Sequence, residues 1–104
     1  MRHFVIGDIH GHAQALQSIL THIQPEMEDC ITFLGDYIDR GPDSRRVLDL
    51  ILDLPCQVDA LAGNHEALLL ASLEDPEVER HWLQYGGETT LSSFGVTEVH
   101  DIPD

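Results

Sequence analysis

The sequence predicts an α/β fold built on a parallel sheet. Three short runs rich in apolar residues, at positions 3–6, 31–34 and 57–62, have the length of buried strands. Each run is followed by a loop containing glycine and then by a segment with apolar residues at helical spacing. Strands that alternate with helices favour parallel pairing with right-handed crossovers. The 104 residues are therefore expected to form a β-α-β-α-β-α unit within one domain.

The first two helices have clear sequence boundaries. Apolar residues recur every three or four positions over about residues 13–23, and Pro25 ends that pattern. The second helix is expected to start at Asp43 or Ser44, because either side chain can accept a hydrogen bond from a free backbone N–H of the first turn. Pro55 stops it.

Three more helices are expected after the third strand. The first covers about residues 65–73, the second runs from Pro76 to about Tyr85, and the third covers 88–94. Asp75 and Pro76 form a favourable helix start, since proline has no N–H to leave unbonded in the first turn. No element is predicted over residues 96–104, which show no clear period.

The charge balance excludes several function classes. Five basic residues against nineteen acidic ones give a net charge of −14, which argues against binding to a nucleic-acid backbone or an anionic membrane. All five basic residues are arginines. The absence of lysine excludes Schiff-base chemistry and a phosphate-binding P-loop.

The termini and the cysteines indicate a cytoplasmic location. The apolar run before Asp8 is too short for a signal peptide, and no run approaches the ~18 residues of a membrane span. Cys30 and Cys56 lie beside predicted strands and are interpreted as buried free thiols rather than a disulfide or metal pair.

Polar residues follow each predicted strand. The three loops read GDIHG at 7–11, GDYIDRGP at 35–42 and GNHE at 63–66. Ligands of parallel sheets bind beyond the carboxyl ends of the strands, so these loops are expected to meet at one edge. Carboxylate, imidazole and carboxamide side chains there would suit Mn²⁺, Fe or Zn²⁺. The side chains expected at that edge are Asp8, His10, Asp36 and Asn64.

The three motifs, in this order, resemble the calcineurin-like metallophosphoesterases. Within that superfamily the chain resembles the bacterial branch of the phosphoprotein phosphatases. The later stretch WLQYGG at 82–87, with Thr90-Leu91 and residues 93–95, is similar to that branch as well. The resemblance covers most of the chain and implies the N-terminal half of a two-sheet sandwich flanked by helices, so residues 1–104 are read as the N-terminal portion of one catalytic domain.

The resemblance also implies a metal centre. Two divalent ions, Mn²⁺ first and Fe or Zn²⁺ as alternatives, would serve the complete domain. Asp8 and His10 would bind the first ion, Asp36 would bridge both, and Asn64 would bind the second. A phosphate monoester is a dianion, so a chain of charge −14 needs cations to hold it.

The expected reaction is hydrolysis of a phosphoprotein or another phosphoester by direct attack of metal-bound hydroxide. By the same resemblance, His65 would protonate the leaving oxygen, Asp39 would orient His65, and Arg40 would bind the phosphate oxygens bidentately. The leading function is a serine/threonine protein phosphatase.

Two other functions stay open at this stage. The first is a symmetrical dinucleoside tetraphosphatase, a close relative whose branch usually has alanine at the position of Asp39. The second is a non-catalytic metal-binding or interaction fragment. Other residues are expected to have structural rather than catalytic roles. Glu66 orients a loop or serves as a favourable first-turn charge, and His12 is an exposed helix start. Trp82 and Tyr85 are interpreted as packing residues.

The second half of the family's domain has no counterpart in this sequence. That half supplies two further metal-binding histidines and a second phosphate-binding arginine, and no such motif follows Gly95. The isolated chain is therefore expected to hold at most one metal ion tightly and to be weakly active or inactive. It is also expected to leave a sheet face or edge uncovered and to self-associate.

Overall fold

The computed structural model describes residues 1–103 and has a three-stranded parallel sheet at its centre. The strands are β1 (His3–Ile6), β2 (Cys30–Phe33) and β3 (Gln57–Ala60), in the order β1-β2-β3. In register, Phe4 of β1 pairs with Ile31 of β2, which pairs with Val58 of β3. The predicted α/β class with parallel pairing is confirmed.

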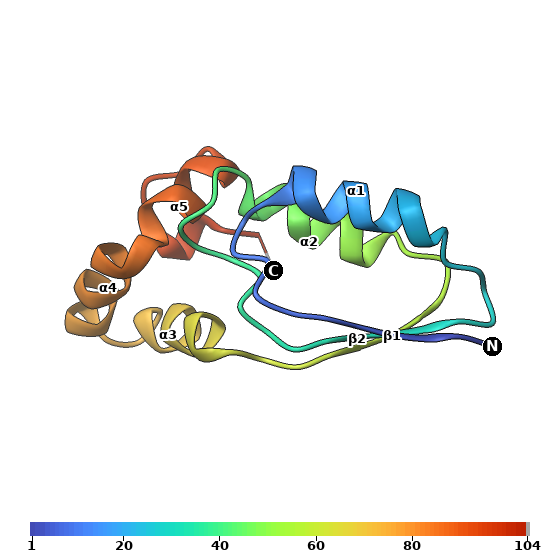
Figure 1. Cartoon of the computed structure of the whole chain (residues 1–104). Coiled ribbons are helices and arrows are strands. Elements are labelled where there is room, and N and C mark those ends of the chain that lie inside the picture. The colour runs from blue at the N-terminus through green and yellow to red at the C-terminus, as the bar shows by residue number, and fades with distance from the viewer. Residues whose placement is uncertain (104) are drawn as a thin grey trace.

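Two helices cover one face of this sheet. Figure 1 shows α1 (Ala13–Ile23) and α2 (Ser44–Leu52) side by side above the strands. Leu16 of α1 and Val47 of α2 pack against Ile31 and Phe33 with almost no exposed surface. Asp43 is the N-cap of α2, and its Oδ1 accepts the Arg46 N–H at 3.1 Å, as the sequence predicts.

The remaining helices stand beyond the carboxyl ends of the strands (Figure 1). They are α3 (Asn64–Ser72), α4 (Pro76–Trp82), a π-helical turn η1 (Leu83–Gly87), α5 (Glu88–Phe94) and a 3₁₀ turn η2 (Val99–Asp101). Trp82, Leu91 and Val99 form a second hydrophobic core there. The molecule measures 45 × 20 × 20 Å, with the two cores along its length.

The element boundaries differ from prediction at a few places. The helix expected from Pro76 to Tyr85 ends at Trp82, and the chain bends at Gly86, whose φ of 113° is outside the helical region. Turn η2 lies where no element was predicted. Strands β2 and β3 end one and two residues early, although Leu34 N–H and Leu61 N–H still bond to the neighbouring strand at 2.9 Å.

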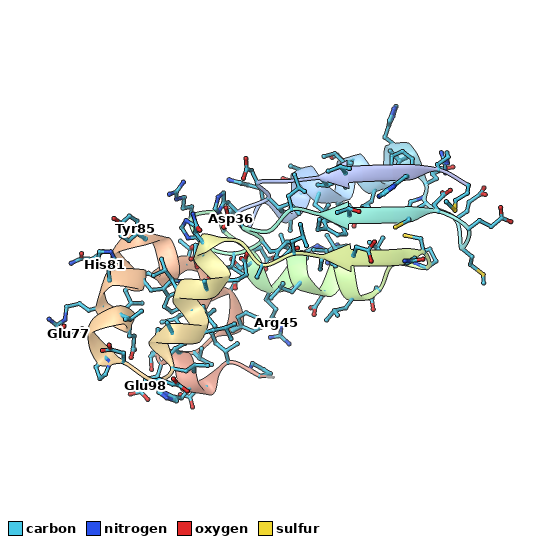
Figure 2. The ribbon with its side chains drawn as sticks, turned by 90° about the horizontal axis from the view of Figure 1, so that it is seen from below. Asp36, Arg45, Glu77, His81, Tyr85 and Glu98 are labelled. Atoms are coloured by element: carbon cyan, nitrogen blue, oxygen red, sulfur yellow. The ribbon has the colours of Figure 1, made fainter. Side chains whose placement is uncertain are left out.

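No helix of residues 1–103 covers the opposite face of the sheet (Figure 1). Figure 2 views the molecule from this side, with the strands in front of the helices. Val5, Leu34 and Leu61 are between 52% and 62% exposed there. His3 Nε2 and Thr32 Oγ1 form a 2.8 Å hydrogen bond on the same face. The prediction of an uncovered sheet face agrees with this arrangement.

Both cysteines are free thiols, as expected. Cys30 is buried and Cys56 is partly buried. Burial, with a smaller contribution from Asp59, raises the pKa of the Cys30 thiol above its ordinary value.

Helix length in residues 1–103 falls short of what a bilayer requires. The longest helix is α1 with 11 residues, and none is both long and apolar enough to span a membrane.

Candidate metal centre and active site

The loops after β1 and β2 are joined by backbone hydrogen bonds. His10 N–H donates to the Asp36 carbonyl at 2.9 Å, and Gly11 N–H donates to the Tyr37 carbonyl at 2.8 Å. In return, Gly41 N–H donates to the His10 carbonyl at 2.9 Å. The two loops therefore form one hydrogen-bonded platform at the carboxyl end of the sheet.

The predicted site residues have unusual backbone conformations. Six non-glycine residues of the described chain have positive φ, and five of them are predicted site residues. These five are Asp8 (54°), His10 (43°), Asp36 (57°), Asp39 (74°) and Arg40 (72°). Such conformations are unfavourable outside glycine and concentrate at functional sites. The strain is independent support for a site in these loops.

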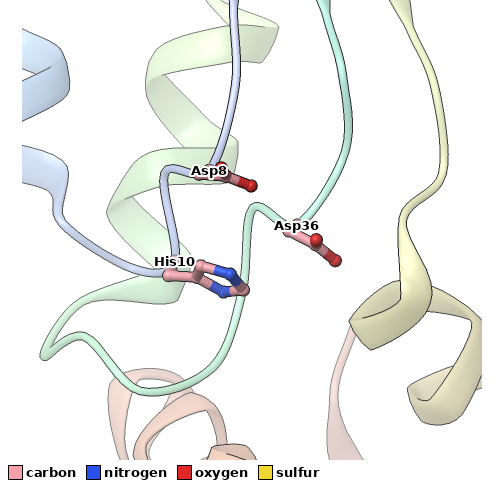
Figure 3. Close-up of side chains that lie close together, drawn as sticks. All are labelled: Asp8, His10 and Asp36. Atoms are coloured by element: carbon pink, nitrogen blue, oxygen red, sulfur yellow. The ribbon is translucent and has the colours of Figure 1, made fainter.

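Asp8, His10 and Asp36 bring potential metal ligands together. One ligand atom from each lies within 4.8 Å of the others, and Figure 3 shows the two carboxylates and the imidazole close together. His10 Nδ1 donates to the Ile38 carbonyl at 3.0 Å, since a carbonyl can only accept. The second ring nitrogen, Nε2, is left as a free electron-pair donor, as in metal-binding histidines.

This donor set fits a divalent cation. Two carboxylates and one imidazole suit Mn²⁺, Fe or Zn²⁺ equally well, so the set does not select among them. A cation would also offset two neighbouring negative charges.

Asn64 lies next to Asp36 at the first position of α3. His65 N–H donates to Asp36 Oδ1 at 3.1 Å. On the other side, Gly63 approaches Asp36 so closely that any Cβ there would collide with the Asp36 carboxylate. Asn64 is thus flanked by two residues that contact Asp36, and its side chain is exposed. The predicted second-metal role of Asn64 stays a prediction.

Glu66 holds the loops after β2 and β3 together. Its Oε1 accepts the Asp36 N–H at 2.6 Å and the Gly63 N–H at 2.9 Å, and its Oε2 accepts the Tyr37 N–H at 2.9 Å. Of the two interpretations left open, loop orientation therefore applies, and Glu66 also lies in the first turn of α3. Burial, followed by the nearby Glu66 charge, raises the pKa of Tyr37 above its ordinary value.

His65 and Asp39 form a buried pair beside the ligand cluster. His65 Nδ1 donates to Asp39 Oδ2 at 2.7 Å, and the Asp39 side chain has no exposed surface. The rings of His10 and His65 contact edge to face, with centroids 4.8 Å apart and an interplanar angle of 77°. The metal-ligand cluster and the His65–Asp39 pair are therefore one site.

Arg40 is exposed at the rim of this site. Its backbone N–H donates to the Gly86 carbonyl at 3.2 Å, and a Cβ on Gly86 would lie 2.9 Å from Arg40 Cγ. Glycine at 86 therefore allows η1 to support the loop that carries Arg40. Among the residues described, Arg40 forms no ion pair, unlike Arg2, whose guanidinium lies 2.8 Å from Asp29. Its charge is free to bind an anion.

Sequence reasoning missed two contributors to the site. Trp82 is fully buried, as expected of a packing residue, but its Nε1–H also donates to Asp39 Oδ2 at 2.7 Å. Thr90 Oγ1 donates to Asp39 Oδ1 at 2.6 Å. The only sequence signal for either was its position within the later stretch similar to bacterial phosphoprotein phosphatases. Tyr85, interpreted as a packing residue, is instead 48% exposed.

Comparison with known proteins settles the family. The model of the calcineurin-like phosphoesterases matches residues 1–101. The chain belongs to this family. Its members use divalent metal ions, which agrees with the donor set of Asp8, His10 and Asp36.

Three curated relatives illustrate the range of the family around this member. A symmetrical bis(5'-nucleosyl)-tetraphosphatase of Legionella pneumophila is 43% identical over 74 residues, covering 70% of this chain and 27% of that protein. Serine/threonine-protein phosphatase 2 of Escherichia coli K12 is 43% identical over 87 residues, which cover 82% of this chain and 38% of that protein. The zinc-dependent endopolyphosphatase of Saccharomyces cerevisiae is 32% identical over 100 residues, which cover 94% of this chain and 30% of that protein.

A solved structure has the same fold. The crystal structure of a protein described as a candidate diadenosine tetraphosphatase superposes with a TM-score of 0.62 at 25% identity. The match covers 88% of this family member and 41% of that chain. The present chain thus spans less than half the length of each of these four proteins.

Proposed function

We propose that this chain is the N-terminal portion of a metal-dependent phosphoric monoester hydrolase of the serine/threonine protein phosphatase type. The observation that carries the proposal is the contact between His10 and His65, whose ring centroids are 4.8 Å apart. That contact joins a cation-binding cluster to an imidazole held by a buried carboxylate. The unpaired Arg40 completes the set that a phosphate ester requires.

Each residue has a role that follows from its surroundings. Divalent ions held by Asp8, His10, Asp36 and Asn64 would supply Lewis-acid activation. Asp39 accepts the Nδ1 proton of His65, so the protonated ring can release its Nε2 proton to a leaving oxygen. Arg40 would bind phosphate oxygens through its planar guanidinium. These assignments require no covalent enzyme intermediate.

Asp39 favours the protein phosphatase type. The tetraphosphatase branch usually has alanine at this position, and here the carboxylate is buried and hydrogen-bonded to His65. A carboxylate with no exposed surface is unfavourable unless its partners need it, which argues that the His65–Asp39 pair is a working feature.

A comparison of substrates tests the proposal. With Mn²⁺, we expect the chain to release phosphate slowly from a phosphoserine peptide and to hydrolyse diadenosine tetraphosphate, followed by the ADP it forms, more slowly still. A His65→Gln variant should lose this activity, whereas Asp49→Asn, an exposed change on α2, should retain it. A faster rate on the dinucleotide would instead support the second function.

That second function, a symmetrical dinucleoside tetraphosphatase, is favoured by a different observation. The rings of His81 and Tyr85 contact each other with centroids 4.6 Å apart, and Figure 2 labels both near the end of α4 that leads into η1. Tyr85 directly precedes Gly86, which contacts Arg40. An exposed aromatic pair beside an arginine is suited to stacking a base. Curated tetraphosphatases of 43–45% identity add to this support.

The third function is a non-catalytic metal-binding or interaction fragment. Tight Mn²⁺ binding without hydrolysis of either substrate would favour it. The proposed self-association rests on the exposed Val5, Leu34 and Leu61 of the uncovered sheet face. Sedimentation should therefore show dimers or larger species, and a compact monomer would contradict that expectation.

A further inference from the structure

The Asp39 carboxylate accepts three side-chain hydrogen bonds in a fully buried position. His65 Nδ1 and Trp82 Nε1 donate to Oδ2, both at 2.7 Å, and Thr90 Oγ1 donates to Oδ1 at 2.6 Å. Trp82, Thr90 and Asp39 have no exposed surface. Three donors on one carboxylate stabilise its negative charge.

The protons of this network can be accounted for one by one. Thr90 has a single hydroxyl proton, which goes to Asp39 Oδ1, so Ser44 must donate across the 3.0 Å contact between the two hydroxyls. The two hydroxyl oxygens, Thr90 Oγ1 and Ser44 Oγ, then both accept the backbone N–H of Asp39, at 2.9 Å and 3.1 Å. Thr90 thus holds the backbone and the carboxylate of Asp39 at the same time.

Trp82 and His65 both donate a hydrogen bond to Oδ2 of Asp39. An indole N–H can only donate, and it approaches the same oxygen as the His65 ring. Asp39 therefore cannot rotate without breaking a bond to Trp82 or to Thr90. A carboxylate that cannot rotate keeps the proton of His65 on Nδ1 and leaves Nε2 for the substrate.

We propose that Trp82 and Thr90 are positioning residues, which lock Asp39 and thereby fix the ring orientation and tautomer of His65. This role rests on the proposed function of His65 as proton donor. It also explains why a tryptophan from α4 and a threonine from α5, 43 and 51 residues away from Asp39 in sequence, reach the same buried carboxylate.

The test reads His65 directly by side-chain ¹H–¹⁵N NMR on the metal-free chain. The His65 signals are assigned by their loss in His65→Gln. Thr90→Val removes the hydroxyl at nearly constant volume, and Trp82→Phe removes the N–H and keeps an aromatic ring. In both we expect the Nδ1 proton to exchange about tenfold faster or more, together with signals of the Nε2–H tautomer.

Two further variants are the controls. Thr90→Ser keeps the hydroxyl and should restore the exchange rate to within about twofold of the unchanged chain. Thr97→Val makes the same substitution at an exposed threonine and should have no effect on His65.

Two results would overturn the proposal. The first is an unchanged His65 tautomer and exchange rate in Thr90→Val and Trp82→Phe with native backbone spectra. The second is loss of the native backbone spectrum in both, because the network would then serve folding rather than His65. The readout uses neither metal nor substrate, so a chain that fails to hydrolyse phosphoesters would favour the non-catalytic fragment over the proposed function and leave this result intact.

Discussion

Replacing Asp36 with asparagine isolates the charge of the central ligand. Asp36 Oδ1 accepts the His65 N–H at 3.1 Å, and an amide oxygen can accept the same bond. The residue has a φ of 57°, a conformation that asparagine tolerates as well as aspartate does. The substitution therefore removes one negative charge from the cluster and leaves the loop in place.

The expected loss can be scaled from the geometry. Asp36 supplies one of three ligand atoms that lie within 4.8 Å of one another. Loss of a group that merely supports a ligand typically weakens metal affinity by 10–100-fold, so loss of a ligand charge should fall at the upper end, about 100-fold. That factor corresponds to about 2.8 kcal/mol of binding free energy.

Calorimetric titration with Mn²⁺ measures this directly. We expect about one tight ion per unchanged chain and about 100-fold weaker binding to Asp36→Asn. The matched control is Asp49→Asn, which removes the same charge from an exposed position on α2. Equal affinities for the unchanged chain and Asp36→Asn would refute the reasoning, as would an equal loss in Asp49→Asn or two tight sites per chain.

Three further predictions concern stability. Glu66→Gln should lower the free energy of unfolding in urea by about 1–3 kcal/mol, because its carboxylate accepts backbone N–H groups from two loops, whereas exposed Glu74→Gln should change it little. The Arg2 guanidinium lowers the pKa of Asp29 from 3.8 to about 2. The ionised Asp29 therefore contributes fully to the free energy of unfolding above pH 4, and this contribution is lost as the pH falls toward 2. Asp29→Asn should abolish this pH dependence of the urea midpoint. Leu16→Ala should cost about 2–5 kcal/mol by the same measurement, since Leu16 is buried between α1 and the sheet.

The sheet and the helices that cover it were predictable because local patterns specify them. Short apolar runs bounded by glycine marked the strands, and Asp43 marked the start of α2 through a contact only three residues long. A helix break at Gly86 was predictable, because the glycine pair at 86–87 is expected to end the preceding helix, but the packing of η1 against Arg40, 46 positions earlier in the chain, was not. Local propensity carries no record of such a contact.

The candidate site likewise has a part that could be predicted from the sequence and a part that could not. Asp8, His10, Asp36 and Asn64 could be placed at one edge because parallel strands bring their ends together. The partners of Asp39 could not be found in this way. Trp82 and Thr90 look like ordinary core residues in sequence, and only the tertiary structure shows that their polar atoms reach a buried carboxylate.

Asp39 also lies on a seam between two separately packed parts of the molecule. Its loop belongs to the part built on the sheet, while Trp82 and Thr90 belong to the part built around the second core. A seam of this kind can open with less free energy than either part needs to unfold. Transient separation of α4 and α5 from the sheet would therefore free His65, while Asp8, His10 and Asp36 stay close together. Proton donation and cation binding can then be lost independently of each other.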